Sequence, residues 1–136
     1  MNTNVQNTAA LVGRILLALI FIISGFGKIT GYAGTAGYMA SKGLPMVAVL
    51  LPLTILVELG GGLLIALGWK ARWAAAVIFL FIIPVTLVFH NPVGLDAAQA
   101  QQQMINLLKN LSIMGGMLGL FAFGPGGFSI DAKQSA

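Results

Sequence analysis

The chain of 136 residues has no cysteine, one histidine and only three acidic residues. Without cysteine, disulfide relays, zinc ribbons, iron–sulfur clusters and thiolate nucleophiles are excluded, because each of them needs sulfur. A single histidine cannot supply the two ligands of a bis-histidine haem, and no metal site is expected from so few ligating side chains. Any redox role would therefore need a cofactor that the chain does not carry covalently.

Charge is scarce as well. Charged residues make up 7% of the chain and hydrophobic residues 58%, against about 25% and about 45–50% in an ordinary soluble domain. So few charges cannot cover the surface that a soluble globule of 14.2 kDa exposes to water. The expected solvent, and the first expected partner, is the lipid bilayer. The seven basic residues are scattered along the chain, so the clustered basic patch of a nucleic-acid-binding protein is absent.

Four apolar runs organise the sequence, at residues 9–28, 46–68, 73–90 and 104–123. Each is close to the length of about 20 residues that a helix needs to cross the hydrocarbon core. None shows the alternation of a membrane β-strand. The pattern predicts an all-α bundle of four transmembrane helices in one integral membrane domain, residues 1–136. Asp96 and Gln99 form a capping-box pattern, so the last helix is expected over residues 97–123.

The segment between the first two runs, residues 30–43, predicts a short interfacial helix. It lies between Gly31 and the sequence Gly43-Leu44-Pro45, which is typical of a helix stop followed by a new start. Four aromatic residues are expected at the headgroup level of the membrane, namely Tyr32, Tyr38, Trp69 and Trp73.

The basic residues of the loops predict the orientation. With the N-terminus inside, Lys70, Arg72 and Lys133 face the cytoplasm, and Lys28 and Lys42 face outward. The positive-inside rule therefore favours cytoplasmic N- and C-termini in a prokaryotic plasma membrane. The first run is expected to stay on the chain, because Ser24-Gly25-Phe26-Gly27 is a poor signal-peptidase site.

Three charged residues, Arg14, Glu58 and Lys109, lie inside the apolar runs. Each costs about 2.5–3.5 kcal/mol at the centre of a membrane helix, so we expect all three to face the bundle interior. Glu58 is then expected to pair with Arg14 or with Lys109. Two interpretations stay open: an ion pair that fixes helix register, or a proton or ligand role.

Polar residues recur every three or four positions along the fourth run, which predicts a polar face turned toward the bundle interior. His90, at the end of the third run, is either a helix end-cap or a hydrogen-bond donor to a headgroup such as a quinone carbonyl. The candidate ligand-binding residues are Arg14, Glu58, His90, Asn106 and Lys109. The spacing of Gly115 and Gly119 suits close helix packing, either within the chain or in a homo-oligomer.

Three motifs in this order make the sequence resemble a known family. They are GRIL (13–16) leading to FIISGFGK (21–28), then ELGGG (58–62), and KNLSIMGG (109–116). Together they resemble the DoxX family of small bacterial and archaeal membrane proteins. The resemblance implies a four-helix integral membrane protein, and some relatives are linked to quinone-coupled sulfur oxidation or to membrane oxidant-defence complexes. It also singles out Arg14, Lys28, Glu58 and Lys109.

The resemblance and the composition together predict an accessory or quinone-associated subunit of a membrane redox system. Quinone is the cofactor this implies, and a redox partner subunit would supply the electrons. The isolated chain is not expected to be catalytic. Two alternatives stay open: a small carrier or proton-conducting protein that uses Glu58 as its titrating group, and a purely structural assembly factor.

Overall fold

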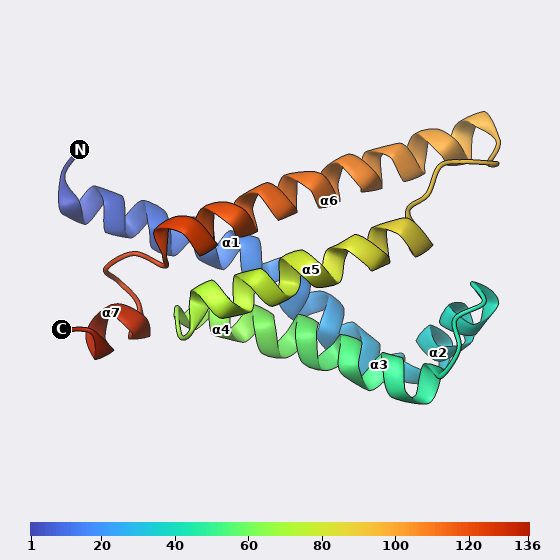
Figure 1. The fold of residues 1–136 in the computed structure, drawn as a ribbon, viewed down its shortest axis with the longest axis horizontal. Coiled ribbons are helices and arrows are strands. Elements are labelled where there is room, and N and C mark those ends of the chain that lie inside the picture. Colours follow the sequence, from blue (N-terminus) through green and yellow to red (C-terminus); the bar gives the residue numbers. More distant parts are fainter.

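The computed structural model describes all 136 residues and consists of helices without a β-strand. Four stretches of helix are long and apolar enough to cross a membrane, which confirms the predicted fold class. They are α1 (Thr3–Thr30), α5 (Ala71–Phe89), α6 (Ala97–Phe123), and a composite span of α3 (Val47–Ile55), the π-helix η1 (Leu56–Gly60) and α4 (Gly61–Leu67). The spans run roughly along the long axis of the molecule, with both termini at one end (Figure 1).

Two short helices lie at opposite ends of the bundle (Figure 1). The first, α2 (Tyr32–Ser41), is the helix expected between the first two spans, and Gly43 follows it in a left-handed conformation with φ 79°. The second, α7 (Ile130–Gln134), lies near the termini. We call the two ends of the molecule the α2 end and the termini end.

The side chain of Asp96 begins α6 by accepting a hydrogen bond of 2.8 Å from the backbone N–H of Gln99. An oxygen acceptor at this position satisfies one of the free N–H groups of the first helical turn. The helix therefore begins at Ala97, the residue that the capping pattern predicts.

Asp131 of α7 caps a different helix, the start of α5. Its carboxylate accepts hydrogen bonds from the backbone N–H groups of Lys70 (2.7 Å) and Ala71 (3.0 Å). The carbonyl of Gly68 in turn accepts a hydrogen bond from the backbone N–H of Asp131. These contacts hold the C-terminal segment against the tight turn between α4 and α5.

The core lies where α1, α4 and α5 pack together, and its fully buried side chains include Ala18, Ile65 and Ile78. In contrast, α6 packs along α5 and has few contacts with α1. Long apolar side chains such as Leu16 and Leu87 are well exposed on the outside of the bundle. In a protein with four spanning helices, these outward apolar faces meet lipid.

Candidate functional site

A cavity of about 450 Å³ lies at the α2 end of the bundle, lined by residues of α1, α3, η1, α5 and α6 and covered by α2. Its volume is in the range of about 300–1,000 Å³ that is typical of small-molecule sites. Most of the lining is apolar. Its polar side chains include Ser24, Lys28, Glu58, His90 and Asn110.

Lys28, Glu58 and Ser24 form a connected cluster on one wall of the cavity. The Nζ of Lys28 lies 2.9 Å from Oε2 and 3.2 Å from Oε1 of Glu58. The same Nζ donates to Ser24 Oγ at 2.7 Å, and the Ser24 hydroxyl donates to Glu58 Oε2 at 3.2 Å. Glu58 is buried. The ion pair of Lys28 and Glu58 therefore lies within the membrane-spanning part of the protein and carries no net charge.

Close packing of α1 against the second span makes this cluster possible. A Cβ at Gly25 would lie 2.8 Å from the backbone nitrogen of Leu59, so no larger residue fits without movement. Ser24 and Lys28 are four residues apart and lie on the same side of α1. Glu58 lies in the π-helical turn η1, a rare local geometry that often occurs at functional sites.

His90 lies on the opposite wall, where Gln103 orients its ring. His90 Nδ1 is 3.0 Å from Gln103 Oε1, and the same oxygen accepts a hydrogen bond of 3.3 Å from Asn106 Nδ2. Because an amide oxygen only accepts, this contact fits the tautomer with its proton on Nδ1, in which Nε2 is an acceptor.

Two further contacts complete the cavity. Asn110 donates from Nδ2 to Thr86 Oγ1 at 2.9 Å and has no protein donor on its Oδ1. The rings of Tyr38 on α2 and Phe89 on α5 stack with 5.5 Å between their centroids. This aromatic pair joins the roof of the cavity to α5.

The predicted pairing of Glu58 with Arg14 is wrong. Arg14 is buried, as expected, but its guanidinium donates to the backbone carbonyls of Ala66, Pro125 and Phe128. Arg14 precedes Lys28 by 14 residues, which is about 21 Å of helix at 1.5 Å per residue. Arg14 is therefore far from Glu58 and ties the end of α4 to the segment after α6.

The predicted inward position of Lys109 is also wrong. Lys109 is exposed on α6 and does not line the cavity. The inward face of α6 carries Asn110 and Ile113, and Lys109 falls on its flank. Because α6 packs mainly on α5, much of its circumference has no protein neighbour.

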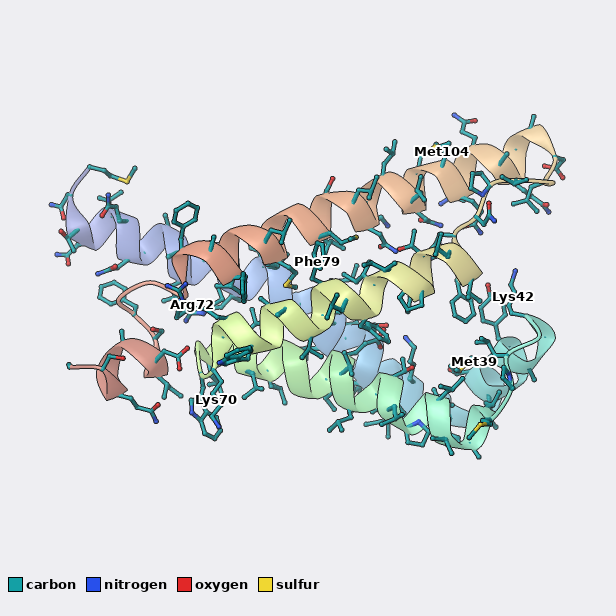
Figure 2. The ribbon with its side chains drawn as sticks, in the orientation of Figure 1. Met39, Lys42, Lys70, Arg72, Phe79 and Met104 are labelled. Carbon is teal, nitrogen blue, oxygen red and sulfur yellow. The ribbon has the colours of Figure 1, made fainter.

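Arg72 caps the far end of α6 at the termini end. Its Nη1 donates to the carbonyls of Phe121 (2.9 Å) and Ala122 (2.8 Å). Figure 2 shows Lys70 and Arg72 near the α4–α5 turn, whereas Lys42 and Met39 lie with α2 at the other end. Arg72 thus serves a helix end and does not line the cavity.

Of the five candidate residues from the sequence, only Glu58 and His90 line the cavity. Asn106 contributes indirectly, through its hydrogen bond to Gln103. The five ligand-binding candidates did not include Ser24, Lys28 or Asn110, although the family resemblance singled out Lys28. The i, i+4 spacing of Ser24 and Lys28 is a signal that could have added both, but Lys28, the last residue of the first apolar run, was counted with the outward-facing loop charges.

Four apolar spans and a buried ion pair define an integral membrane protein of the small helical-bundle class. The sequence model of the DoxX family matches residues 9–91, more than half of the chain. The chain therefore belongs to the DoxX family. No solved structure matches the chain.

Two curated relatives from Escherichia coli (strain K12) match nearly the whole chain. Inner membrane protein YqjF is 42% identical over 126 residues, which cover 93% of this chain and 92% of the relative. Inner membrane protein YphA is 36% identical over 123 residues, which cover 90% and 88%. These relatives and the four apolar helices support a location in a prokaryotic inner membrane.

Proposed function

We propose that this protein binds the headgroup of a quinone-type lipid in the cavity at the α2 end and serves as an accessory subunit of a membrane redox system. The observation that carries the proposal is the cavity itself: about 450 Å³, mostly apolar, with polar groups on two facing walls. Such a site suits a ring with polar substituents and an apolar tail. Glu58 and His90 are the residues expected to contact the headgroup.

The tail of the ligand would leave between α1 and α6. Ile20 of α1 and Ile113 of α6 both line the cavity, and these two helices make few contacts with each other. Ile20 is 43% exposed although it lines the cavity. A bound tail would thus reach lipid without crossing a packed helix interface.

The chain supplies binding and orientation in this proposal, and a quinone would supply the electron chemistry when bound. The sequence has no cysteine and a single histidine, so we expect a partner subunit to exchange the electrons. A proton-conducting role for Glu58 has less support, because the buried core between the cavity and the termini end is apolar.

The test is a titration of the protein in nanodiscs with a short-chain quinone. We expect saturable binding that weakens in Glu58→Gln and in His90→Leu. Lys109→Met is the matched control, because it removes an intramembrane charge that does not line the cavity. Linear partitioning that is the same in all four proteins would disprove the proposal.

A further inference from the structure

The hydrogen-bonding groups that the protein fixes on the α5–α6 wall are acceptors. Gln103 Oε1 lies 3.0 Å from His90 Nδ1 and accepts a hydrogen bond of 3.3 Å from Asn106 Nδ2, which places an acceptor opposite Nδ1. In the neutral ring with its proton on Nδ1, the Nε2 atom of His90 carries a lone pair and accepts hydrogen bonds. Asn110 uses Nδ2 on Thr86 and keeps its Oδ1 unused.

The facing wall also has its donors in use. The ammonium of Lys28 has three N–H groups, and it has three acceptors within 3.2 Å: Ser24 Oγ and the two oxygens of Glu58. The Ser24 hydroxyl donates to Glu58. On this wall, the remaining lone pairs of the Glu58 carboxylate are still free to accept a hydrogen bond from a ligand.

The residues of α2 and α3 that line the cavity add few fixed hydrogen-bond donors. The hydroxyl of Thr35 donates to the carbonyl of Gly31. The hydroxyls of Tyr38 and Thr54, which also line the cavity, rotate freely and can donate or accept. The acceptors that face the cavity are thus His90 Nε2 on one wall and the carboxylate of Glu58 on the other, and Asn110 adds its Oδ1 when its Nδ2 is bonded to Thr86.

We infer that the cavity selects a headgroup that donates hydrogen bonds, and that it therefore prefers the dihydroxy, reduced form of a quinone-type ring over the diketone. This inference rests on the proposed function. A diketone has only acceptors and would set its oxygens against His90 Nε2 and Asn110 Oδ1. A buried acceptor without a donor costs about 1–3 kcal/mol, which corresponds to a preference of about fivefold to about 150-fold for the hydroxylated form.

The binding experiment compares three ligands with the same short tail, under anaerobic conditions and with the protein in nanodiscs. They are a hydroquinone, its quinone and its dimethyl ether, which cannot donate. We expect the hydroquinone to bind about tenfold more tightly than either of the others. In Gln103→Leu the ring of His90 is free to change tautomer, so the ratio should fall toward one. Gln101→Leu, at an exposed position of the same helix, should keep the wild-type ratio.

A second measurement does not depend on any variant or ligand. His90 is the only histidine, so the ¹⁵N NMR spectrum of the labelled imidazole reports its tautomer without overlap. We expect the proton on Nδ1 in the neutral ring. A proton on Nε2 would overturn the inference.

The outcomes separate the two proposals. Equal saturable affinities for the hydroquinone and the quinone would contradict the donor preference and leave the binding function intact. If none of the three ligands binds saturably, the proposed function itself fails.

Discussion

Lys28 of α1 and Glu58 of η1 form the only salt bridge of the protein, with 2.9 Å between Nζ and Oε2. Their side chains are 24% and 9% exposed, so the pair is shielded from water but lies at the wall of the cavity. It joins the C-terminal part of the first span to the middle of the second. The pair thus fixes helix register and at the same time provides the charged wall of the candidate site.

Replacing Glu58 with Gln should lower the free energy of unfolding by about 1–3 kcal/mol, because Lys28 then lacks its ionic partner. The double variant Lys28→Met with Glu58→Gln should lose less than the sum of the two single variants, by a coupling of about 0.5–3 kcal/mol. Unfolding in mixed detergent micelles measures both quantities.

Lys109 provides the control for this cycle. Because Lys109 is exposed on α6, the pair Lys109→Met and Glu58→Gln should be additive within about 0.5 kcal/mol. Additivity for Lys28 and Glu58, with coupling to Lys109 instead, would contradict the observed pairing.

Gly25→Ala should separate α1 from η1. The new methyl group would lie 2.8 Å from the nitrogen and 2.9 Å from the Cβ of Leu59, and such overpacking typically costs about 1–3 kcal/mol. Ligand binding should weaken as well, because the Lys28–Glu58 contact depends on this approach. Thermal unfolding and the quinone titration are the measurements.

Gly27→Ala is the matched control, since a Cβ at Gly27 has no neighbour within 4 Å. Alanine favours a helix over glycine by about 0.5–1 kcal/mol, so this variant should be neutral or more stable. Equal destabilisation by the two substitutions would mean that the contact between Gly25 and Leu59 is not the cause.

The sequence predicted the helices well, because local chemistry determines them. The apolar runs give the four spans, and Asp96 with Gln99 marks the start of α6 to the residue. The first span was harder, because polar residues extend it at both ends: α1 begins at Thr3 and continues to Thr30. Hydropathy alone ended the predicted span at Lys28, although a lysine in the last turn is favourable and the helix continues beyond it to Thr30.

The site was predicted less well, because it depends on helix rotation and on pairing between spans. Glu58 was expected to meet Arg14 or Lys109, yet Lys28 is its partner. The periodicity of a single helix does not say which of its polar residues faces a neighbour. In α6 the inward position belongs to Asn110, and Lys109, one residue before it, points about 100° away around the helix.

Arg14→Met should loosen the C-terminal segment. It leaves the carbonyls of Ala66, Pro125 and Phe128 without their shared donor, and hydrogen bonds to a charged group contribute about 1.5–3 kcal/mol. We expect faster hydrogen exchange and proteolysis in residues 124–136, with the cavity unchanged. Arg14→Lys should rescue only in part, because one ammonium cannot reproduce the fork of a guanidinium. Unchanged protection in Arg14→Met would show that the contacts of Asp131 and of Asn7 hold the segment without Arg14.

The termini are predicted to lie in the cytoplasm, because Lys70 and Arg72 lie at the start of α5 and Lys133 in α7, at the termini end, whereas Lys28 and Lys42 lie beside α2 at the other end. A fluorescent protein fused to the C-terminus should fluoresce, and an alkaline phosphatase fused there should be silent. The same reporters inserted after Gly43 should give the reverse result. An active C-terminal phosphatase would invert the topology.

The ligand is predicted to enter between α1 and α6, which both line the cavity and make few contacts with each other. The chain has no native cysteine, so Ile20→Cys with Ile113→Cys can be joined by a short bis-maleimide without side reactions. Because both residues line the cavity, this cross-link should slow association of a short-chain quinone by about tenfold or more.

A cross-link at the termini end is the control for that experiment. Asn7 Oδ1 accepts a hydrogen bond of 3.0 Å from the backbone N–H of Gly127, so Asn7→Cys with Gly127→Cys ties α1 to the C-terminal segment away from the cavity. This pair should leave association unchanged. A third pair, Thr54→Cys with Val85→Cys, spans the other side of the cavity, between α3 and α5. A cross-link slows association only when it blocks the route that the ligand takes. If the Thr54–Val85 cross-link slows association and the Ile20–Ile113 cross-link does not, the ligand enters between α3 and α5.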